Sequence, residues 1–428
     1  MRSLIKLIEK TYRMADPLEG KTVLHNAALL SGLQTVTYLL PIVILPYLFQ
    51  IIGPERFGLI SFAQAFVQYF VILTDYGFNI TATKEISLCQ NEHVQVCKVF
   101  SSVMTVKIIL AILSLLILGA IVHFVPKFQN DWMVYMFSFG VVAGNTLFPV
   151  WFFQGTEKMK YIAQLNIIGE FAYAAFIFIF IKGPQDYLMV PVISSSVFLT
   201  TGLLGQYIVF RTFKMSFKLP GYKNLRQQLD AGWNLFVSIV AINAYTTTRV
   251  FAVGLLTNNT LTGLYSIAER IANVVQTFPL SSFTQAIFPR LSKMFQKNKI
   301  KAFAMMRQIQ LITINIALIC LPLIFLAAPL IVRVVCGGDY PQAALSLRLL
   351  IVSIFFISAN AFRVQFLLVC GKTHTYSKIH VGMAIIGLPL IIIFIDLFSY
   401  VGAALATVAI EAGIFSLTYV AIKKLKWS

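Results

Sequence analysis

Charged residues are scarce in this chain. Only 12% of its 428 residues are Asp, Glu, Lys or Arg, and 58% are apolar, whereas a soluble globular domain carries about 25% charged residues. A soluble protein of this length could not cover its core with so little polar surface. The composition therefore excludes a cytosolic globular enzyme. The 14% aromatic content excludes a disordered chain.

Cysteine and catalytic motifs are also sparse. None of the five cysteines forms a CxxC pair or a cluster with metal-ligand spacing, so neither a disulfide framework nor a metal site is expected. Two Gly-Lys-Thr triplets, at 20–22 and 371–373, lack the earlier glycine that a phosphate-binding loop requires. No connection is long enough for a soluble catalytic domain. We therefore expect no cofactor and no enzyme activity.

What the chain has instead is long apolar runs. A membrane-spanning helix needs about 20 largely apolar residues, and twelve stretches meet this requirement. The expected fold is an all-α membrane protein with twelve transmembrane helices at 24–49, 57–80, 102–125, 132–154, 161–181, 187–210, 232–256, 262–288, 309–332, 343–369, 377–397 and 400–422. The basic region at 1–22 does not have the pattern of a cleaved signal peptide.

The distribution of Lys and Arg predicts the orientation in the membrane. With the N-terminus inside, 25 of the 34 basic residues fall in cytoplasmic segments, and four fall in loops on the other side. Cytoplasmic loops of membrane proteins carry this excess, so both termini are predicted to be cytoplasmic. The same placement accounts for most of the net charge of +18 through topology and contact with lipid. Nucleic acid is not an expected partner.

An internal repeat divides the chain into two halves. Gly58-Leu59-Ile60-Ser61-Phe62-Ala63-Gln64 and Gly263-Leu264-Tyr265-Ser266-Ile267-Ala268-Glu269 share four identical positions and open spans 2 and 8. We predict an N-terminal six-helix lobe at 1–210, a cytoplasmic linker at 211–230 and a C-terminal six-helix lobe at 231–428. Parallel repeats of six spans are related by an axis along the membrane normal, which leaves a cleft between the lobes.

Polar residues recur along one face of three predicted spans. The stripes comprise Ser61, Gln64, Gln68, Asp75 and Asn79 in span 2; Asn234, Ser238, Tyr245, Thr248 and Arg249 in span 7; and Ser266, Glu269, Arg270, Asn273, Thr277 and Thr284 in span 8. Single polar residues often only hold helices together. Stripes in repeat-related spans favour a water-filled cavity instead.

The candidate cavity residues combine cations, acids and amides. Arginine keeps its charge and its planar fork suits phosphate, while Asp75 or Glu269 could pair with it or carry a coupling ion. The predicted substrate-cavity set is Arg249, Arg270, Arg363, Asp75, Glu269, Gln64, Gln68, Lys107, Asn273, Asn234 and Tyr245. Proton or sodium coupling is left open. Glu170 and Arg348 lie near span ends, and Glu411 suits helix contacts equally well.

Several motifs resemble one known family. They are Leu45-Pro46-Tyr47-Leu48, Ile52-Gly53-Pro54-Glu55-Arg56-Phe57-Gly58, Asp75-Tyr76-Gly77-Phe78-Asn79 with Ala82-Thr83-Lys84-Glu85-Ile86, and Trp151-Phe152-Phe153-Gln154-Gly155-Thr156-Glu157-Lys158-Met159. Together they resemble the bacterial O-antigen flippases (Wzx type), in the polysaccharide transporter branch of the MOP superfamily. The C-terminal half matches more diffusely.

This resemblance implies a substrate and a location. The family carries undecaprenyl-diphosphate-linked oligosaccharides from the cytoplasmic to the periplasmic leaflet of the bacterial inner membrane. The implied fold has two six-helix bundles around a V-shaped central cavity, and access to that cavity alternates between the two sides. Membrane lipid, a polysaccharide polymerase and a chain-length regulator are the implied partners. The resemblance does not specify the sugar.

Three other functions compete with this interpretation. A cation-coupled drug exporter of the same superfamily would favour an acidic cavity, whereas basic residues slightly outnumber acidic ones within the predicted spans. A polysaccharide polymerase or ligase would need a large periplasmic loop, and none is predicted. A pure scaffold would leave the intramembrane charges unexplained.

Overall fold

The computed structural model describes residues 17–425; within this range the side chains of 17–39, 41, 278–286, 288–290 and 293 lie outside the description. Every regular element in the described range is a helix, which confirms the all-α prediction for this part of the chain. The elements are α2 (Pro17–Asp75), α3 (Phe78–Cys89), α4 (His93–Phe124), α5 (Pro126–Gln129), α6 (Trp132–Ser138), α7 (Gly140–Leu147), α8 (Val150–Gly155), α9 (Met159–Phe180), η1 (Pro184–Leu188), α10 (Met189–Thr212), α11 (Tyr222–Thr246), α12 (Thr248–Leu256), α13 (Asn259–Lys297), α14 (Lys299–Cys336), α15 (Pro341–Val369), α16 (Thr373–Phe398) and α17 (Tyr400–Lys423).

Two backbone breaks interrupt the first helical stretch. Gly53 has a φ of 76° and a ψ of 166°, so α2 consists of two helices joined at this residue. Glycine tolerates this conformation because it has no Cβ atom. Tyr76 and Gly77 also have positive φ, and they separate α2 from α3. Both breaks fall in motifs that the sequence singled out.

The apolar helices support a multi-pass membrane fold. In residues 17–425, nine helical segments are long and apolar enough to cross a membrane, or ten if α11 and α12, which meet at 50°, form one span. The segment Ile42–Cys89 counts once, although it contains a predicted span and part of another. The helix α13 is not among the nine, and it carries the charged stripe of span 8. The total of twelve remains a prediction.

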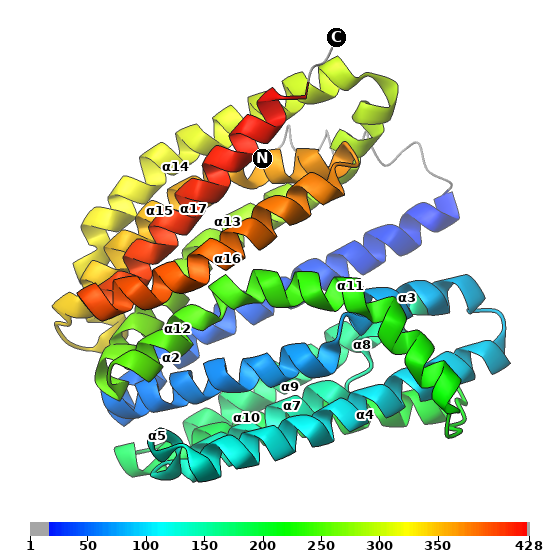
Figure 1. Cartoon of the computed structure of the whole chain (residues 1–428), viewed down its shortest axis with the longest axis horizontal. Coiled ribbons are helices and arrows are strands. Elements are labelled where there is room, and N and C mark those ends of the chain that lie inside the picture. Colours follow the sequence, from blue (N-terminus) through cyan, green and yellow to red (C-terminus); the bar gives the residue numbers. More distant parts are fainter. Residues whose placement is uncertain (1–16, 426–428) are drawn as a thin grey trace.

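The helices form two groups (Figure 1). In the first group α2 packs on α9, α10 packs on α7 and α9, and α3 packs on α8. In the second group α15 packs on α13, α14 and α17, and α16 packs on α17. The helix α12 packs on α13, α16 and α17 and is counted with the second group, although it also contacts α2. The helices α2, α11 and α12 lie along the boundary between the groups in Figure 1, and α2 makes extensive contact with α13. The cleft of the predicted fold would lie along this contact.

The helix axes of the two groups converge toward one end of the molecule and diverge toward the other (Figure 1). We call the end with the connections at Gly53, 125–131, 257–258 and 337–340 the narrow end. The end with the connections at 90–92, 156–158, 213–221 and 370–372 is the wide end. The predicted orientation assigns the narrow end to the periplasm.

The two repeat glycines meet where α2 crosses α13 near the narrow end. A Cβ atom added to Gly58 would lie 1.7 Å from the Asn259 carbonyl oxygen and 2.6 Å from the Gly263 nitrogen. A Cβ atom added to Gly263 would lie 2.0 Å from the Pro54 carbonyl oxygen. The backbones therefore touch directly, and glycine at both positions allows this close crossing.

Candidate functional site

Arg270 connects the two helix groups in the middle of the molecule. Its Nη2 atom, on α13, donates a hydrogen bond to the Gln64 Oε1 atom on α2 at 2.6 Å. The guanidinium also lies 5.4 Å from the centre of the Phe57 ring. Gln64 is the last residue of the first repeat heptapeptide, and Arg270 directly follows the second. The predicted stripes of spans 2 and 8 therefore meet at this pair.

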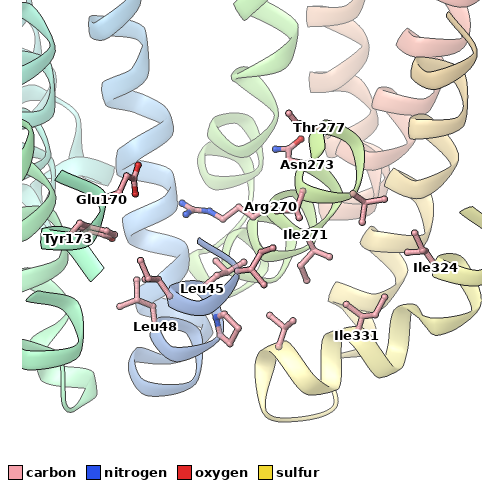
Figure 2. Close-up of a pocket in the computed structure, with 16 residues that line it drawn as sticks. Leu45, Leu48, Glu170, Tyr173, Arg270, Ile271, Asn273, Thr277, Ile324 and Ile331 are labelled. Carbon is pink, nitrogen blue, oxygen red and sulfur yellow. The ribbon is translucent and has the colours of Figure 1, made fainter. Parts of the chain in front are cut away.

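Arg270 lies at the junction of two cavities of different character. The first, of about 470 Å³, is bounded by α2, α9, α13 and α14 and is mostly apolar, with Leu45, Leu48 and Ile331 among its walls. Figure 2 shows Arg270 extending from α13 toward Glu170 and Tyr173 on α9. We call this the apolar cavity.

The second cavity, of about 230 Å³, lies between α2, α9, α10 and α13. Its polar wall residues are Gln64, Asn166, Glu170, Tyr173, Ser194, Thr201 and Arg270. We call it the polar cavity. Arg270, Glu170 and Tyr173 line both spaces, so a guanidinium and a carboxyl group stand where an apolar and a polar compartment meet. A molecule with an apolar tail, an anionic centre and a polar head fits this order of environments.

Arg249 occupies a separate site within the second helix group. Its Nε atom lies 3.1 Å from Glu269 Oε1, and its Nη1 atom donates to Thr407 Oγ1 at 3.3 Å. Arg249 and Glu269 border a third cavity of about 310 Å³, which Glu411 and Asn273 also line. We call this the Arg249 cavity. Asn273 lines the apolar cavity as well, so α13 borders all three spaces.

Asp75 and Lys107 form a buried pair inside the first group. Lys107 Nζ lies 3.9 Å from Asp75 Oδ1, and the lysine side chain is only 3% exposed. Asn79 donates a hydrogen bond to the same carboxylate at 2.7 Å. Asp75 is eleven residues beyond Gln64 on α2, which corresponds to about 16 Å along a helix. Asp75 and Lys107 line none of the three cavities.

The remaining predicted residues have different surroundings. Gln68 and Asn234 are exposed, and the buried Tyr245 bonds to His380 Nδ1 through its hydroxyl at 3.0 Å. Arg363 lies 4.5 Å from the centre of the Phe415 ring. Its Nη1 atom is buried without a hydrogen-bond partner among the described residues. The structure brings Arg270 together with Gln64 and Arg249 together with Glu269. Asn273 lines one cavity with each arginine. Thr284 lies outside the described side chains.

Sequence reasoning missed the contribution of α9. Asn166, Glu170 and Tyr173 line the polar cavity from this helix. Their spacing of four and three residues is that of a single helical face, so the same periodicity test applied to span 5 would have found them. The apolar wall residues carry no such signal, because apolar side chains occur throughout the chain.

Comparison with known proteins decides the family. Residues 23–295 match the family described as polysaccharide biosynthesis protein. The chain belongs to this family. Over 411 residues, covering 94% of this chain and 97% of its relative, the chain is 31% identical to a protein of Escherichia coli (strain K12) assigned as an O-antigen transporter. A Shigella dysenteriae protein with the same assignment is 25% identical over 369 residues, covering 85% and 90% of the two chains.

Solved structures of the MOP superfamily share the fold of this polysaccharide biosynthesis protein. An inward-facing MATE multidrug resistance transporter matches with a TM-score of 0.71 at 15% identity, over 91% of this chain and 93% of the other. The lipid II flippase MurJ in an inward closed conformation matches with a TM-score of 0.70 at 12% identity, over 94% and 88%. The resemblance stated from sequence is confirmed, and the chain is a multi-pass bacterial membrane protein of a transporter family rather than an enzyme.

Proposed function

We propose that this chain moves undecaprenyl-diphosphate-linked O-antigen or a related oligosaccharide repeat unit from the cytoplasmic to the periplasmic leaflet of the bacterial inner membrane. The observation that carries the proposal is the position of Arg270 between an apolar and a polar cavity. The relatives named O-antigen transporters support the substrate class. The fold is similar to that of a lipid II flippase, which is consistent with a flippase role.

Each part of the substrate corresponds to one environment in the structure. The first isoprene units suit the walls formed by Leu45, Leu48 and Ile331, while the rest of the tail stays in the bilayer. The diphosphate suits the Arg270 guanidinium, which can donate two parallel hydrogen bonds to phosphate oxygens. The sugars suit the amides and hydroxyls of the polar cavity.

The polar cavity lowers the barrier that the bilayer imposes. Each polar group moved into hydrocarbon without a hydrogen-bond partner costs several kcal/mol, roughly 2–7 depending on the reference state. An oligosaccharide has many hydroxyls, so this cost prevents spontaneous crossing. Asn166, Ser194 and Thr201 offer replacement partners, and Arg270 offsets the charge of the diphosphate. A negative-inside potential assists outward movement of the anion by about 2.3 kcal/mol per charge per 100 mV.

Alternating access is the proposed mechanism, and we assign the structure to its inward-facing state on the contacts that follow. Near the narrow end, Gly58 of the first group directly contacts Gly263 of the second group. At the same end Lys127 Nζ donates to the Leu255 carbonyl oxygen at 2.7 Å. The TM-score with an outward-facing MATE transporter is 0.59, below the 0.71 of the inward-facing one.

The proposed topology retains twelve crossings with both termini in the cytoplasm. The break at Gly53 allows α2 to cross the membrane twice. A further crossing is proposed for α13, whose charged residues lower its mean hydropathy. The lobes are proposed at 1–210 and 231–428 with the linker at 211–230. The predicted orientation also counts the basic residues at 1–22, and most of these lie outside the described residues.

Coupling to a proton or sodium ion is also a proposal. The Arg249 cavity contains one arginine and the two carboxyl groups of Glu269 and Glu411. If all three are charged, one negative charge is in excess, so this cavity suits a cation better than a diphosphate. Association with a polysaccharide polymerase and a chain-length regulator stays a prediction from the resemblance.

The test is a complementation experiment in a host that lacks the chain. With wild-type protein we expect surface polysaccharide, and with Arg270→Ala we expect lipid-linked single repeat units to accumulate on the cytoplasmic side. Arg270→Lys should restore part of the polysaccharide. The matched control is Arg333→Ala, since Arg333 is exposed at the narrow end and pairs with Asp339. Normal polysaccharide with Arg270→Ala at a normal protein level would refute the proposal.

A further inference from the structure

Glu170 is an acidic residue in the middle of an apolar helix. It lies eleven residues after the first residue of α9, Met159, and ten before the last, Phe180, which corrects the expectation that it lies near a span end. Ten residues correspond to about 15 Å along a helix, so its side chain cannot reach either membrane surface. Acidic residues at such depths are rare and face a partner or a water-filled space.

The Glu170 carboxyl group has no partner in the part of the chain that the structure describes. No ion pair and no hydrogen bond among the described residues includes it, although the residue is half-buried. Figure 2 shows the Arg270 guanidinium, on α13 of the second group, pointing toward it. Both side chains line the apolar cavity and the polar cavity. The two groups therefore face the same junction without pairing.

Few other groups at this junction can carry a charge. Among the described residues that line the two cavities, Arg270, Glu170 and Tyr173 are the titratable ones. The helices α2 and α10 contribute neutral polar side chains, and α14 contributes apolar ones. The other nearby acid, Glu269, pairs with Arg249 instead. With the Glu170 carboxyl ionised and Arg270 charged, the empty junction is neutral.

The proposed substrate would upset this balance. A diphosphate that joins a polyprenyl chain to a sugar carries one negative charge on each phosphate, and Arg270 compensates only one of them. An ionised Glu170 would add a third negative charge, and like charges in a largely dry space repel strongly. A protonated Glu170 removes this repulsion, and its carboxyl O–H can donate a hydrogen bond to a phosphate or sugar oxygen.

We propose that Glu170 takes up a proton when the diphosphate binds to Arg270, so that proton and substrate occupy the junction together. The proton passes from water in the polar cavity to a carboxylate oxygen of Glu170. It returns to water when the substrate leaves and Glu170 again faces Arg270 as an anion. This proposal rests on the proposed function. The proton is distinct from a cation in the Arg249 cavity, which Glu269 and Glu411 line and Glu170 does not.

The experiment is a calorimetric titration of the purified full chain with lipid-linked single repeat units extracted from the host that lacks the chain. Titrations in two buffers with different enthalpies of ionisation give the number of protons taken up. The diphosphate of this probe, esterified at both ends, does not itself titrate near neutral pH. We expect wild type to take up between zero and one proton near neutral pH. Its affinity should rise as the pH falls, since ligands that bind together strengthen each other reciprocally.

Three variants assign the proton to its residue. Glu170→Gln keeps the size of the side chain and removes its charge, so it should bind the probe without proton uptake. It should also bind about tenfold more tightly, the factor that corresponds to about 1.4 kcal/mol of removed charge repulsion. Glu92→Gln is the matched control, since it removes one carboxylate from an exposed position at the wide end, and it should behave as wild type. Arg270→Ala should lose binding.

The outcomes separate this proposal from the proposed function. Binding that is lost in Arg270→Ala but takes up no proton in wild type would keep the proposed function and overturn the role of Glu170. So would proton release on binding, or equal proton uptake in wild type and folded Glu170→Gln. The wild-type measurement alone can overturn the role of Glu170 if Glu170→Gln does not fold. Failure of wild type to bind the probe would overturn both proposals.

Discussion

Gly58 of α2 and Gly263 of α13 hold the same position in two related heptapeptides, and their backbones touch where the two helices cross. The two copies of the repeat are therefore in contact with each other in the structure. Each half supplies one glycine to a junction near the narrow end. Opening that end would require these two residues to move relative to each other.

Substitution of either glycine by alanine should open the narrow end. An added methyl group would overlap backbone atoms of the opposite helix, and overpacking of this kind costs typically 1–3 kcal/mol. Cysteine probes at the narrow end should become more reactive to a membrane-impermeant maleimide, and transport should fall. Gly119→Ala is the control, because no atom of the residues that the structure describes lies within 4 Å of its Cβ position. Unchanged reactivity in both variants would contradict this role.

The Arg249–Glu269 pair should behave as a unit, in contrast to Arg270. Arg249→Ala leaves the Glu269 carboxylate without its partner at 3.1 Å, and an unpaired buried charge destabilises a protein by about 3–5 kcal/mol. We expect Glu269→Gln to restore the protein level lost in Arg249→Ala. The same substitution should not restore transport to Arg270→Ala. A double-mutant cycle on thermal stability and transport measures both couplings. Additive effects at Arg249 and Glu269 would refute the pairing.

Asp75 should prove structural through its partner Lys107. Asp75→Asn leaves the 3% exposed ammonium of Lys107 without a counter-charge, so we expect a loss of about 3 kcal/mol in stability. Lys107→Met combined with Asp75→Asn should regain most of it. Thermal unfolding of the purified variants measures this. If Asp75→Asn is as stable as wild type but transports poorly at every pH gradient, Asp75 has a direct role in coupling instead.

Lys127 should favour closure of the narrow end. Its ammonium group contacts the carbonyl oxygens of Leu255 and Thr257, where α12 of the other group ends. A cation at a helix C-terminus contributes about 0.3–1 kcal/mol, which corresponds to up to about a fivefold shift between inward-facing and outward-facing populations. Lys127→Ala should increase the outward-facing fraction in double electron–electron resonance distances. Lys182→Ala is the control, because Lys182 follows α9 and bonds to the Phe178 carbonyl oxygen of that same helix, within the first group.

The helices could be predicted from the sequence because the length and apolar composition of each run are enough to indicate a membrane-spanning helix. The break at Gly53 and the turn at Gly77 were visible as motifs, and their positive φ values give the physical reason. The pairing of charges was not predictable in the same way. Glu269 and Arg270 are adjacent in sequence, yet consecutive residues on a helix point in different directions. Glu269 therefore meets Arg249, while Arg270 meets Gln64 on the other group.

The cavities themselves also lay beyond sequence reasoning. The polar stripe of span 2 contains both Gln64 and Asp75, but Gln64 faces the second group and Asp75 pairs with Lys107 inside the first. A helical stripe several turns long contacts different neighbours along its length. Only the packing of α9 against α2 decides which part borders the polar cavity.

The division of α11 between the two groups has a mechanical consequence. Just past its middle, Phe236 stacks on Tyr76 of the first group with ring centres 4.6 Å apart. Near its end, Tyr245 bonds to His380 of the second. The preceding linker at 213–221 is hydrogen-bonded to α4, so it does not let the start of α11 move freely. Any rotation of one lobe against the other must then bend α11 between these two anchors, and the elastic energy of that single helix becomes part of the barrier between the two states.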